Sequence, residues 1–222
     1  MNSAPFPGSP EPWRREPFRP GFNPPGPPPD PPRRESLSPP RVLAYEMNRL
    51  IEMRLVIAHG HLDGERAAEL CSQLMTLDAL GVGEPITLHL RLASADLEAA
   101  FAVVDTMDVL SCPTHALVVG QLGGAALAVL AAARERQITP NAMIRLIEPR
   151  EQSGGTAAEM ALFEEEHRRL VGALYDRLAL VTGRSVEEIR DDAHRGRIFG
   201  ADQAVAYGFV HDVAGSPPPG LG

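Results

Sequence analysis

Lysine is missing from this sequence, and all 21 basic residues are arginine. A chain without lysine cannot use serine–lysine catalysis, a Schiff base or the lysine of a phosphate-binding P-loop. Cysteine is nearly as scarce, because Cys71 and Cys112 are the only two. Two thiols do not make a disulfide framework. These gaps exclude several common kinds of enzyme site before any motif is considered.

Positive charge does not collect in any part of the chain. The 222 residues carry a formal net charge of -8, and the arginines are dispersed, so no basic stripe is available to neutralise phosphates. No apolar run reaches the roughly 18 residues of a membrane span, and no charged segment followed by an apolar one opens the chain. We therefore expect a cytoplasmic protein that binds neither nucleic acid nor membrane.

Proline divides the chain by composition. Fifteen of the 22 prolines fall in residues 1–40, where few aliphatic side chains are present, so we predict a disordered or polyproline II arm there. Such an arm is either a docking site for a proline-reading partner or a solvated tail. Residues 41–213 have the composition of one folded domain, and 214–222 form a Gly/Pro-rich tail.

Aliphatic runs alternate with helical periodicity through this domain. Short apolar strands are expected at residues 54–59, 83–91, 116–119 and 143–147. Helices are expected between them, and Asp96 is a suitable N-cap for one of these helices. Strands separated by helices favour parallel pairing with right-handed crossovers. The pattern therefore predicts an α/β fold with a parallel sheet.

A longer helix follows the last of these strands. From about Thr156 to Thr182 the apolar spacing predicts a single helix that Gly183 ends. Its length of about 40 Å, at 1.5 Å per residue, exceeds what a compact domain of this size requires. We expect it to project and to meet another subunit. Ser185 is then a predicted N-cap, and residues 201–212 predict a short helix and a closing strand.

The stretch HALVVGQLGGAALAVL, residues 115–130, reads as a strand, a glycine turn and an alanine-rich helix. Hydrolases often place a nucleophile in such a turn, yet no Ser, Cys or Thr stands in this one. A displaced nucleophile paired with a nearby histidine stays open, although nothing in the sequence specifies the geometry. The candidates are Ser94, Ser111, Cys112, His89 and His115.

Metal binding is not expected. Cys112 and His115 supply two possible ligands, whereas a structural zinc needs four. The string His59-Gly-His61 is interpreted as loop residues rather than a ligand pair, and Glu148 as a surface charge rather than an acid. We predict no metal and no cofactor.

Several short strings between Arg54 and Asp212 resemble the proteolytic subunit of the Clp protease, ClpP, a serine peptidase that forms stacked seven-membered rings. The strings are Leu62-Asp63, Val104-Asp105-Thr106-Met107, Gly120-Gln121, Pro140-Asn141-Ala142 and Ala201 to Phe209. The resemblance implies the ClpP/crotonase-like spiral of β-α units, in which the long helix is the handle by which two rings interlock.

The same resemblance implies a degenerate catalytic site. The family's nucleophilic serine falls on Gly124, its general-base histidine on Ile147 and its orienting aspartate on Gly196. Removing the serine or the histidine alone from a subtilisin-type triad costs about 10⁶ in turnover. The positions equivalent to the oxyanion hole are Ser94, Ala95 and Ala125. The acidic and basic pair that serves ring–ring contact in the family becomes His194-Arg195.

These replacements predict a member of the ATP-dependent Clp serine endopeptidase family that is not itself an active peptidase. We expect a structural or regulatory subunit in a mixed ring with active ClpP-type paralogues, served by an AAA+ unfoldase. Two alternatives stay open. One is a stand-alone pseudoenzyme that binds a peptide or partner. The other is a crotonase-like thioester enzyme, in which Gly123-Gly124-Ala125 would hold an oxyanion at a helix N-terminus.

Overall fold

The computed structural model describes residues 49–81, 83–149 and 154–215. The predicted proline-rich arm, residues 1–40, lies outside the described residues, as does most of the predicted tail. The elements below all belong to the unit that begins at Arg41. None of the helices described in it combines the length and the apolar character needed to cross a membrane.

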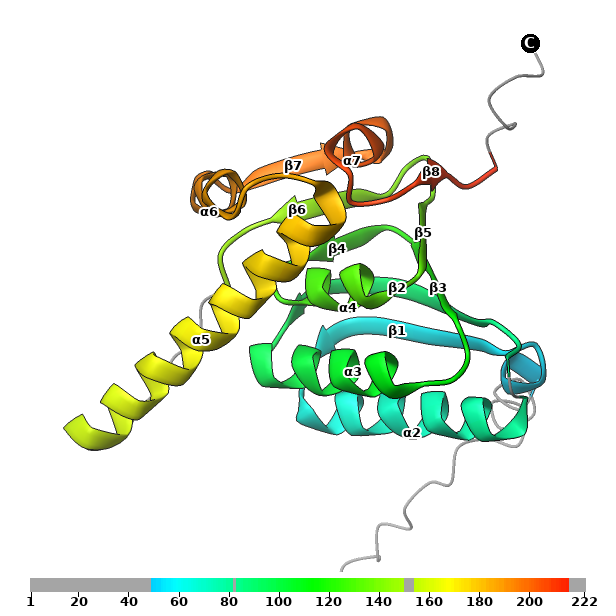
Figure 1. Ribbon diagram of the computed structural model, residues 1–222, viewed down its shortest axis with the longest axis horizontal. Coiled ribbons are helices and arrows are strands. Elements are labelled where there is room, and N and C mark those ends of the chain that lie inside the picture. The colour runs from blue at the N-terminus through cyan, green and yellow to red at the C-terminus, as the bar shows by residue number, and fades with distance from the viewer. Residues whose placement is uncertain (1–48, 82, 150–153, 216–222) are drawn as a thin grey trace, which may run out of the picture. The chain divides into compact units, whose positions relative to one another are not determined.

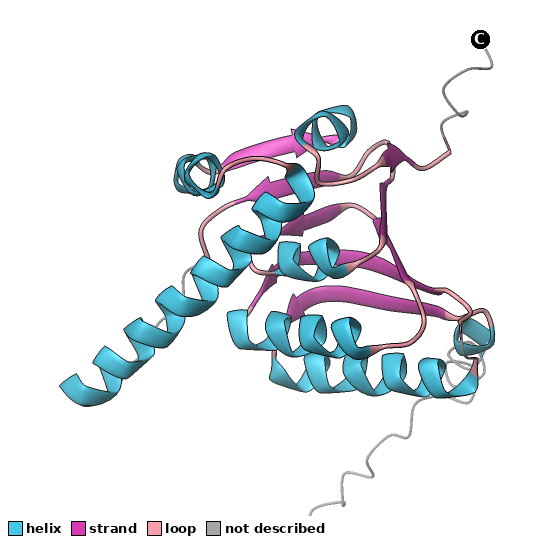
Figure 2. Ribbon diagram, viewed as in Figure 1, coloured by secondary structure: helices cyan, strands magenta, loops and turns pink. Residues whose placement is uncertain are grey.

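Five parallel strands form the larger sheet (Figures 1 and 2). In sheet order they are β1 (Leu55–Leu62), β2 (Ile86–Ala95), β3 (Thr114–Val118), β5 (Glu135–Ile138) and β8 (Asp212–Val213). The connecting helices α2 (Gly64–Leu80) and α3 (Leu97–Val109) pack side by side along it. The predicted parallel α/β fold is confirmed.

A second sheet of three short strands was not predicted. In it, β4 (Gln121–Gly123) pairs in parallel with β6 (Met143–Leu146), and β6 pairs antiparallel with β7 (Arg197–Gly200). Three residues inside a glycine-rich stretch are too few to show an alternating pattern. The strand β4 was missed for this reason, and the four-residue strands β5 and β7 were missed as well.

The core is almost wholly aliphatic. Alternate residues of β2 face it, and each of them is buried: Ile86, Leu88, Leu90 and Leu92. The helix α4 (Ala126–Ala132) is buried on nearly every side. A helix that is apolar all round belongs inside a protein, and the alanines of α4 let its neighbours approach closely. The predicted alanine-rich helix after the glycine turn is therefore a central element of the core.

The long helix α5 (Ala157–Thr182) begins and ends as predicted. At its start, Thr156 and Glu159 form a capping box, in which each side chain accepts a hydrogen bond from the other residue's backbone N–H. At its end, Gly183 takes up a left-handed conformation with φ 69°, which glycine adopts without steric cost. The sequence signals at both ends therefore act locally, independently of what the helix packs against.

Only the C-terminal half of α5 packs on the rest of the unit. Its buried residues are Leu170, Leu174, Tyr175 and Leu178. The N-terminal half extends away from the sheets (Figure 1) and exposes Met160 and Leu162. The helix therefore projects, as its length predicted.

Two further helices flank β7. They are α6 (Val186–Arg195), capped by Ser185 as predicted, and α7 (Ala201–Tyr207), which Gly208 ends with φ 98°. A Cβ at Gly208 would lie 2.9 Å from the Cα of Thr182, so no larger residue fits unless the backbone moves. This close approach joins the end of α7 to the end of α5.

Candidate functional site

A cleft of about 420 Å³ lies at the carboxyl ends of β1 and β2, beside the start of α4. Its lining comes from segments far apart in the sequence. The lining residues are His61, Ser94, Ala95, Asp96, Gly124, Ala125, Ile147, Glu148, Pro149, Ala193, His194 and Gly196. All three positions that the ClpP resemblance aligns with the triad are among them. The three positions aligned with the oxyanion hole are there as well.

Gly124 occupies the turn between β4 and α4. Its φ of +60° is left-handed, a conformation that side chains other than glycine adopt at a cost. Its N–H donates to the carbonyl of Arg145 at 3.3 Å, so this donor is already engaged. Among the described residues, no atom lies within 4 Å of a Cβ built at Gly124. The turn therefore offers open space but no nucleophile, and one N–H fewer for an oxyanion.

The two other triad-aligned positions contact each other. A Cβ at Gly196 would lie 3.8 Å from Cγ2 of Ile147, which is ordinary van der Waals contact. Gly196 also ends α6 with φ 73°, and its N–H donates to the carbonyls of Asp192 and Ala193. The structure thus brings positions 124, 147 and 196 to one cleft. None of them carries a group that can hold or move a proton.

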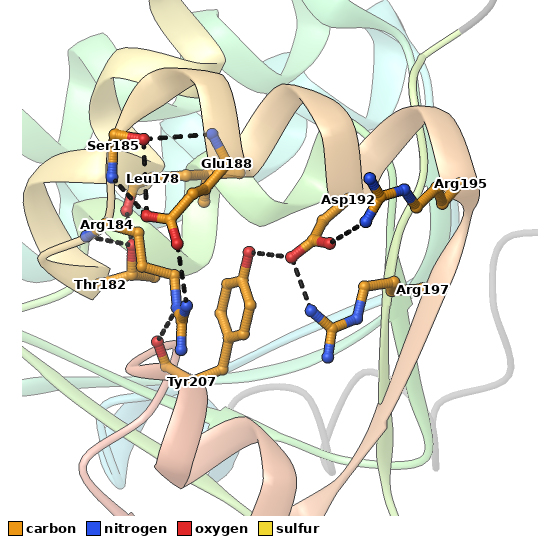
Figure 3. Close-up of polar contacts among 9 residues, drawn as sticks. All are labelled: Leu178, Thr182, Arg184, Ser185, Glu188, Asp192, Arg195, Arg197 and Tyr207. Carbon is orange, nitrogen blue, oxygen red and sulfur yellow. Dashed lines mark hydrogen bonds and ion pairs between the residues drawn. The ribbon is translucent and has the colours of Figure 1, made fainter.

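A buried carboxylate fixes the segment that carries Gly196 (Figure 3). The hydroxyl of Tyr207 donates to Oδ2 of Asp192 at 2.8 Å, and Arg197 donates to the same oxygen at 2.7 Å. Burial alone would raise the pKa of Asp192, but these donors and the positive charge of Arg197 outweigh it and lower that pKa. The ionised carboxylate therefore ties α6 to β7 and α7.

Arg184 holds Tyr207 in place from the other side (Figure 3). Its guanidinium carbon lies 4.0 Å from the centre of the Tyr207 ring, and its Nε donates to the Tyr207 carbonyl at 3.3 Å. Burial raises the pKa of Tyr207, and the hydrogen bond to Asp192 raises it further. The phenol therefore stays protonated and keeps its role as donor.

Two histidine–carboxylate pairs lie in the cleft, and sequence reasoning missed both. In the first, Nδ1 of His194 lies 2.7 Å from Oε2 of Glu148, so Glu148 is paired and is not simply a surface charge. In the second, Nε2 of His61 lies 3.1 Å from Oδ1 of Asp96. The other nitrogen of His61, Nδ1, lies 2.9 Å from Oγ of Ser94.

The interpretation of His59-Gly-His61 as loop residues was wrong, because all three belong to β1. The pairing of His61 with Ser94 joins residues 33 positions apart, and it depends on how two strands align. No local pattern could have shown it. Asp96 was identified only as a helix cap, although its side chain reaches His61 instead.

The thiol of Cys112 does not form the displaced site that was left open. It is buried and donates to the carbonyl of Gly81 at 2.9 Å, and its backbone N–H donates to Asp78 at 2.7 Å. The bonds to Cys112 lower the pKa of Asp78. Cys112 therefore holds the end of α2 in place.

The two histidines proposed for that site lie in strands of the larger sheet. Nδ1 of His115, in β3, lies 3.6 Å from Oε2 of Glu135. His89, in β2, is partly buried, and this burial lowers its pKa.

Within the ranges that the structure describes, no three His, Cys, Asp or Glu side chains are grouped so as to hold a metal.

The glycine elbow, the β-α units and the projecting helix are together typical of the ClpP/crotonase-like class of α/β proteins. A family model described as Clp protease matches residues 41–217. The chain therefore belongs to the Clp protease family, as the sequence motifs predicted.

Curated relatives agree with this assignment. The ATP-dependent Clp protease proteolytic subunit 2 of Nocardia farcinica is 30% identical over 167 residues, which cover 74% of this chain and 82% of the relative. Proteolytic subunit 1 of Thermobifida fusca is 32% identical over 169 residues, 75% of this chain and 76% of the relative. Proteolytic subunit 1 of Corynebacterium jeikeium is 32% identical over 167 residues, 74% of this chain and 89% of the relative.

Proposed function

We propose that this chain is a structural or regulatory member of a cytoplasmic Clp-type ring, and that it does not cleave peptide bonds through the family's triad positions. The observation that carries the proposal is the meeting of Gly124, Ile147 and Gly196 in one cleft. Peptide cleavage by a triad needs a nucleophile and a base within hydrogen-bond reach of each other. These three residues supply neither.

The surface of α5 supports the ring part of the proposal. The N-terminal half of the helix has no buried residue, and Leu162 there is 68% exposed. A helix half that projects and exposes Met160 and Leu162 offers a surface for a protein–protein contact. The relatives are named proteolytic subunits of an ATP-dependent protease, so the partners proposed are a triad-bearing ClpP-type paralogue and an AAA+ unfoldase.

The position that serves ring–ring contact in the family supports a partner other than an identical ring. His194 is bound within its own chain by Glu148, while Arg195 is 72% exposed and lies 3.9 Å from Asp192. The ion pair of Arg195 with Asp192 is long, and the Arg195 side chain is mostly exposed. A carboxylate from a second ring of different sequence would therefore have access to this cation.

The test is native mass spectrometry of the tagged protein purified at low salt from its own host. We expect a seven- or fourteen-membered ring that contains a second, triad-bearing chain. A small species or a homo-oligomer without a Clp partner would overturn the proposal and favour a stand-alone peptide-binding role. A crotonase-like role is disfavoured, because the Gly124 N–H that would hold a thioester oxyanion is bonded to Arg145.

A further inference from the structure

A different serine, histidine and aspartate meet in the same cleft. Oγ of Ser94 lies 2.9 Å from Nδ1 of His61, and Nε2 of His61 lies 3.1 Å from Oδ1 of Asp96. We propose that Ser94 is a nucleophile for acyl transfer, with His61 as its general base, and that its substrate is a small carboxylic ester. This goes beyond the ring role, which concerns subunit contacts and other positions of the cleft.

Asp96 sets the tautomer of His61. An ionised carboxylate can only accept hydrogen bonds. Nε2 of His61 therefore carries the hydrogen, and this N–H donates a hydrogen bond to Asp96. Nδ1 is then unprotonated, and the hydroxyl of Ser94 donates to it. This order is the reverse of that in trypsin-like proteases, where Nε2 faces the serine. Either ring nitrogen can accept a proton when the other is held by a carboxylate.

The side chain of Asp96 does not cap the helix that it precedes. Asp96 is the N-cap of α3, where an aspartate normally accepts from the N–H groups of the first turn, but it makes no such bond. At the start of α2, the N-cap Asp63 does accept from the N–H of Arg66 at 3.0 Å. Capping therefore does not explain the orientation of Asp96, and the contact with His61 does.

A register shift in the sheet brings His61 and Ser94 together. Gly60 pairs with Leu92, but the next residue, His61, pairs with Ser94, so Ala93 is an extra residue in β2. A bulge of this kind redirects the side chains that follow it. Without the shift, His61 would lie opposite Ala93 and no hydroxyl would face the imidazole.

Arg66 holds the backbone at this shift. Its guanidinium donates to the carbonyl of His59 at 2.8 Å and to that of His61 at 3.2 Å. It thereby spans Gly60, whose φ of +88° is left-handed. His61 therefore lies on a strand whose backbone is held by Arg66 of α2 on both sides of the register shift.

The cleft favours an ester with a small acyl group. Part of its lining is apolar, from residues such as Ile147, Pro149 and Ala193. The side chains of His61 and Asp96 are 48% and 49% exposed, so water weakens their electrostatic effect on a developing charge. Cleavage of an amide requires strong stabilisation of the oxyanion and a proton for the leaving nitrogen. The leaving group of an activated ester departs more readily.

The chemical step balances with these residues and water. Ser94 passes its hydroxyl proton to Nδ1 of His61 as Oγ forms a bond with the ester carbonyl carbon. The C–O bond to the leaving group then breaks, and the departing oxygen takes the proton from His61. Water next attacks the acyl-Ser94 ester and gives a proton to His61, which returns it to Oγ as the carboxylic acid leaves. Asp96 acts as a positioning residue throughout.

The test uses the purified full-length protein with a fluorophosphonate probe and with p-nitrophenyl acetate. We expect the probe to label Ser94 in the folded protein, as located by peptide mass spectrometry, and at least tenfold faster than in the denatured protein. Ser94→Ala should abolish labelling at this site, and His61→Gln should slow ester hydrolysis about 100-fold or more. The controls Ser111→Ala and His115→Gln lie outside the cleft and should hydrolyse the ester at the parent rate.

The positioning role of Asp96 must be tested by a measurement that a misfolded variant would not also change. We expect Asp96→Asn to slow hydrolysis at least tenfold without lowering the thermal midpoint, and Asp96→Glu to restore part of the rate. Ser94→Cys gives a second measure, because His61 should make the new thiol react with iodoacetamide faster than the native Cys71. His61→Gln in that background should remove the difference.

Equal labelling of folded and denatured protein, or a Ser94→Cys thiol no faster than Cys71, would overturn the proposal. Neither result would touch the ring role, because native mass spectrometry reports subunit composition whether or not Ser94 reacts. A reactive Ser94 in a protein that never joins a Clp partner would conversely overturn only the ring role.

Discussion

The hydroxyl of Tyr207 and the carboxylate of Asp192 are joined by a 2.8 Å hydrogen bond in the interior, where Asp192 is almost fully buried. The bond connects α7 to the last turn of α6. Since Gly196 follows that turn directly, the pair sets where one wall of the cleft lies. Breaking it should therefore affect both the stability of the unit and the shape of the cleft.

Asp192→Asn should destabilise the protein at neutral pH. The change weakens charge-assisted hydrogen bonds from Tyr207 and Arg197, each worth about 1.5–3 kcal/mol. Urea unfolding followed by circular dichroism measures the loss. The matched control is Asp191→Asn, because Asp191 is exposed and should lose little. Equal effects of the two substitutions would contradict the role assigned to Asp192.

The same carboxylate predicts the direction of the acid response. Folding lowers the pKa of Asp192 below its ordinary value of 3.8. Its stabilisation is therefore fully present above that value and is lost as the pH falls through the lower, folded-state pKa. The parent protein should be no more stable than Asp192→Asn below about pH 4. Urea midpoints of both proteins, measured between neutral and acidic pH, check this. A difference in stability that stays unchanged in strong acid would contradict it.

Two buried tyrosines should respond differently to loss of the hydroxyl. Tyr207→Phe removes the donor to Asp192 and should cost about 1–3 kcal/mol, because a buried acceptor loses a partner. Tyr175→Phe should be neutral or stabilising, because among the described residues its buried hydroxyl has no hydrogen-bond partner. Burial raises the pKa of Tyr175 to about 12, so the phenol is neutral in both measurements. Thermal unfolding of the two variants distinguishes the cases.

Alanine should have opposite effects at two glycines. Gly208→Ala should destabilise by about 2–4 kcal/mol, because it adds a left-handed alanine to a contact of 2.9 Å with the backbone of Thr182. Gly172→Ala, inside α5, meets no described atom within 4 Å and should stabilise by about 0.5–1 kcal/mol. Differential scanning calorimetry should show midpoints that move in opposite directions.

Gly124→Ser should not give peptide cleavage. The side chain has room, but a serine at φ +60° is strained by about 1–2 kcal/mol, and Ile147 and Gly196 supply no base. The triple variant Gly124→Ser/Ile147→His/Gly196→Asp should cleave a fluorogenic peptide above the level of the single variant. Cleavage by Gly124→Ser that persists when His61→Gln is added would refute the assignment of positions 147 and 196.

Charge on the projecting half of α5 should prevent assembly without unfolding the chain. Leu162→Glu places a carboxylate where no residue of the unit packs, so helix content should stay the same while the native mass falls. Leu180→Glu is the matched control, because Leu180 is an exposed leucine on the other half of the helix. If both variants dissociate equally, the contact does not belong to the N-terminal half.

Sequence reasoning succeeded where the signal is local. The start of α5 near Thr156, the cap at Ser185 and the glycine that ends α5 were predicted, because each signal acts within one turn of helix. The strands β4, β5 and β7 were not predicted, since each has three or four residues and lacks the apolar run that marked the equally short β6. The assignment of Gly124, Ile147 and Gly196 to the triad positions rests on the resemblance and stays a prediction, although the structure places all three in the lining of one cleft.

The contacts that the sequence did not reveal are those that depend on register. His61 was interpreted as a loop residue, Ser94 was a candidate nucleophile considered only with His89 and His115, and Asp96 matched a helix cap. Only the shift between Gly60 and His61 decides that the three side chains meet. A shift of one residue in a parallel pair leaves no trace in hydrophobic periodicity when the residues involved are already exposed.

The two sets of residues that line the cleft belong to different structural elements. Positions 124, 147 and 196 belong to a turn, a strand end and a helix cap, whereas His61 and Ser94 belong to adjacent strands of the larger sheet. The register that joins His61 to Ser94 does not depend on which side chains stand at the turn, the strand end and the helix cap. Evolution can therefore vary the two sets of residues separately within one cavity.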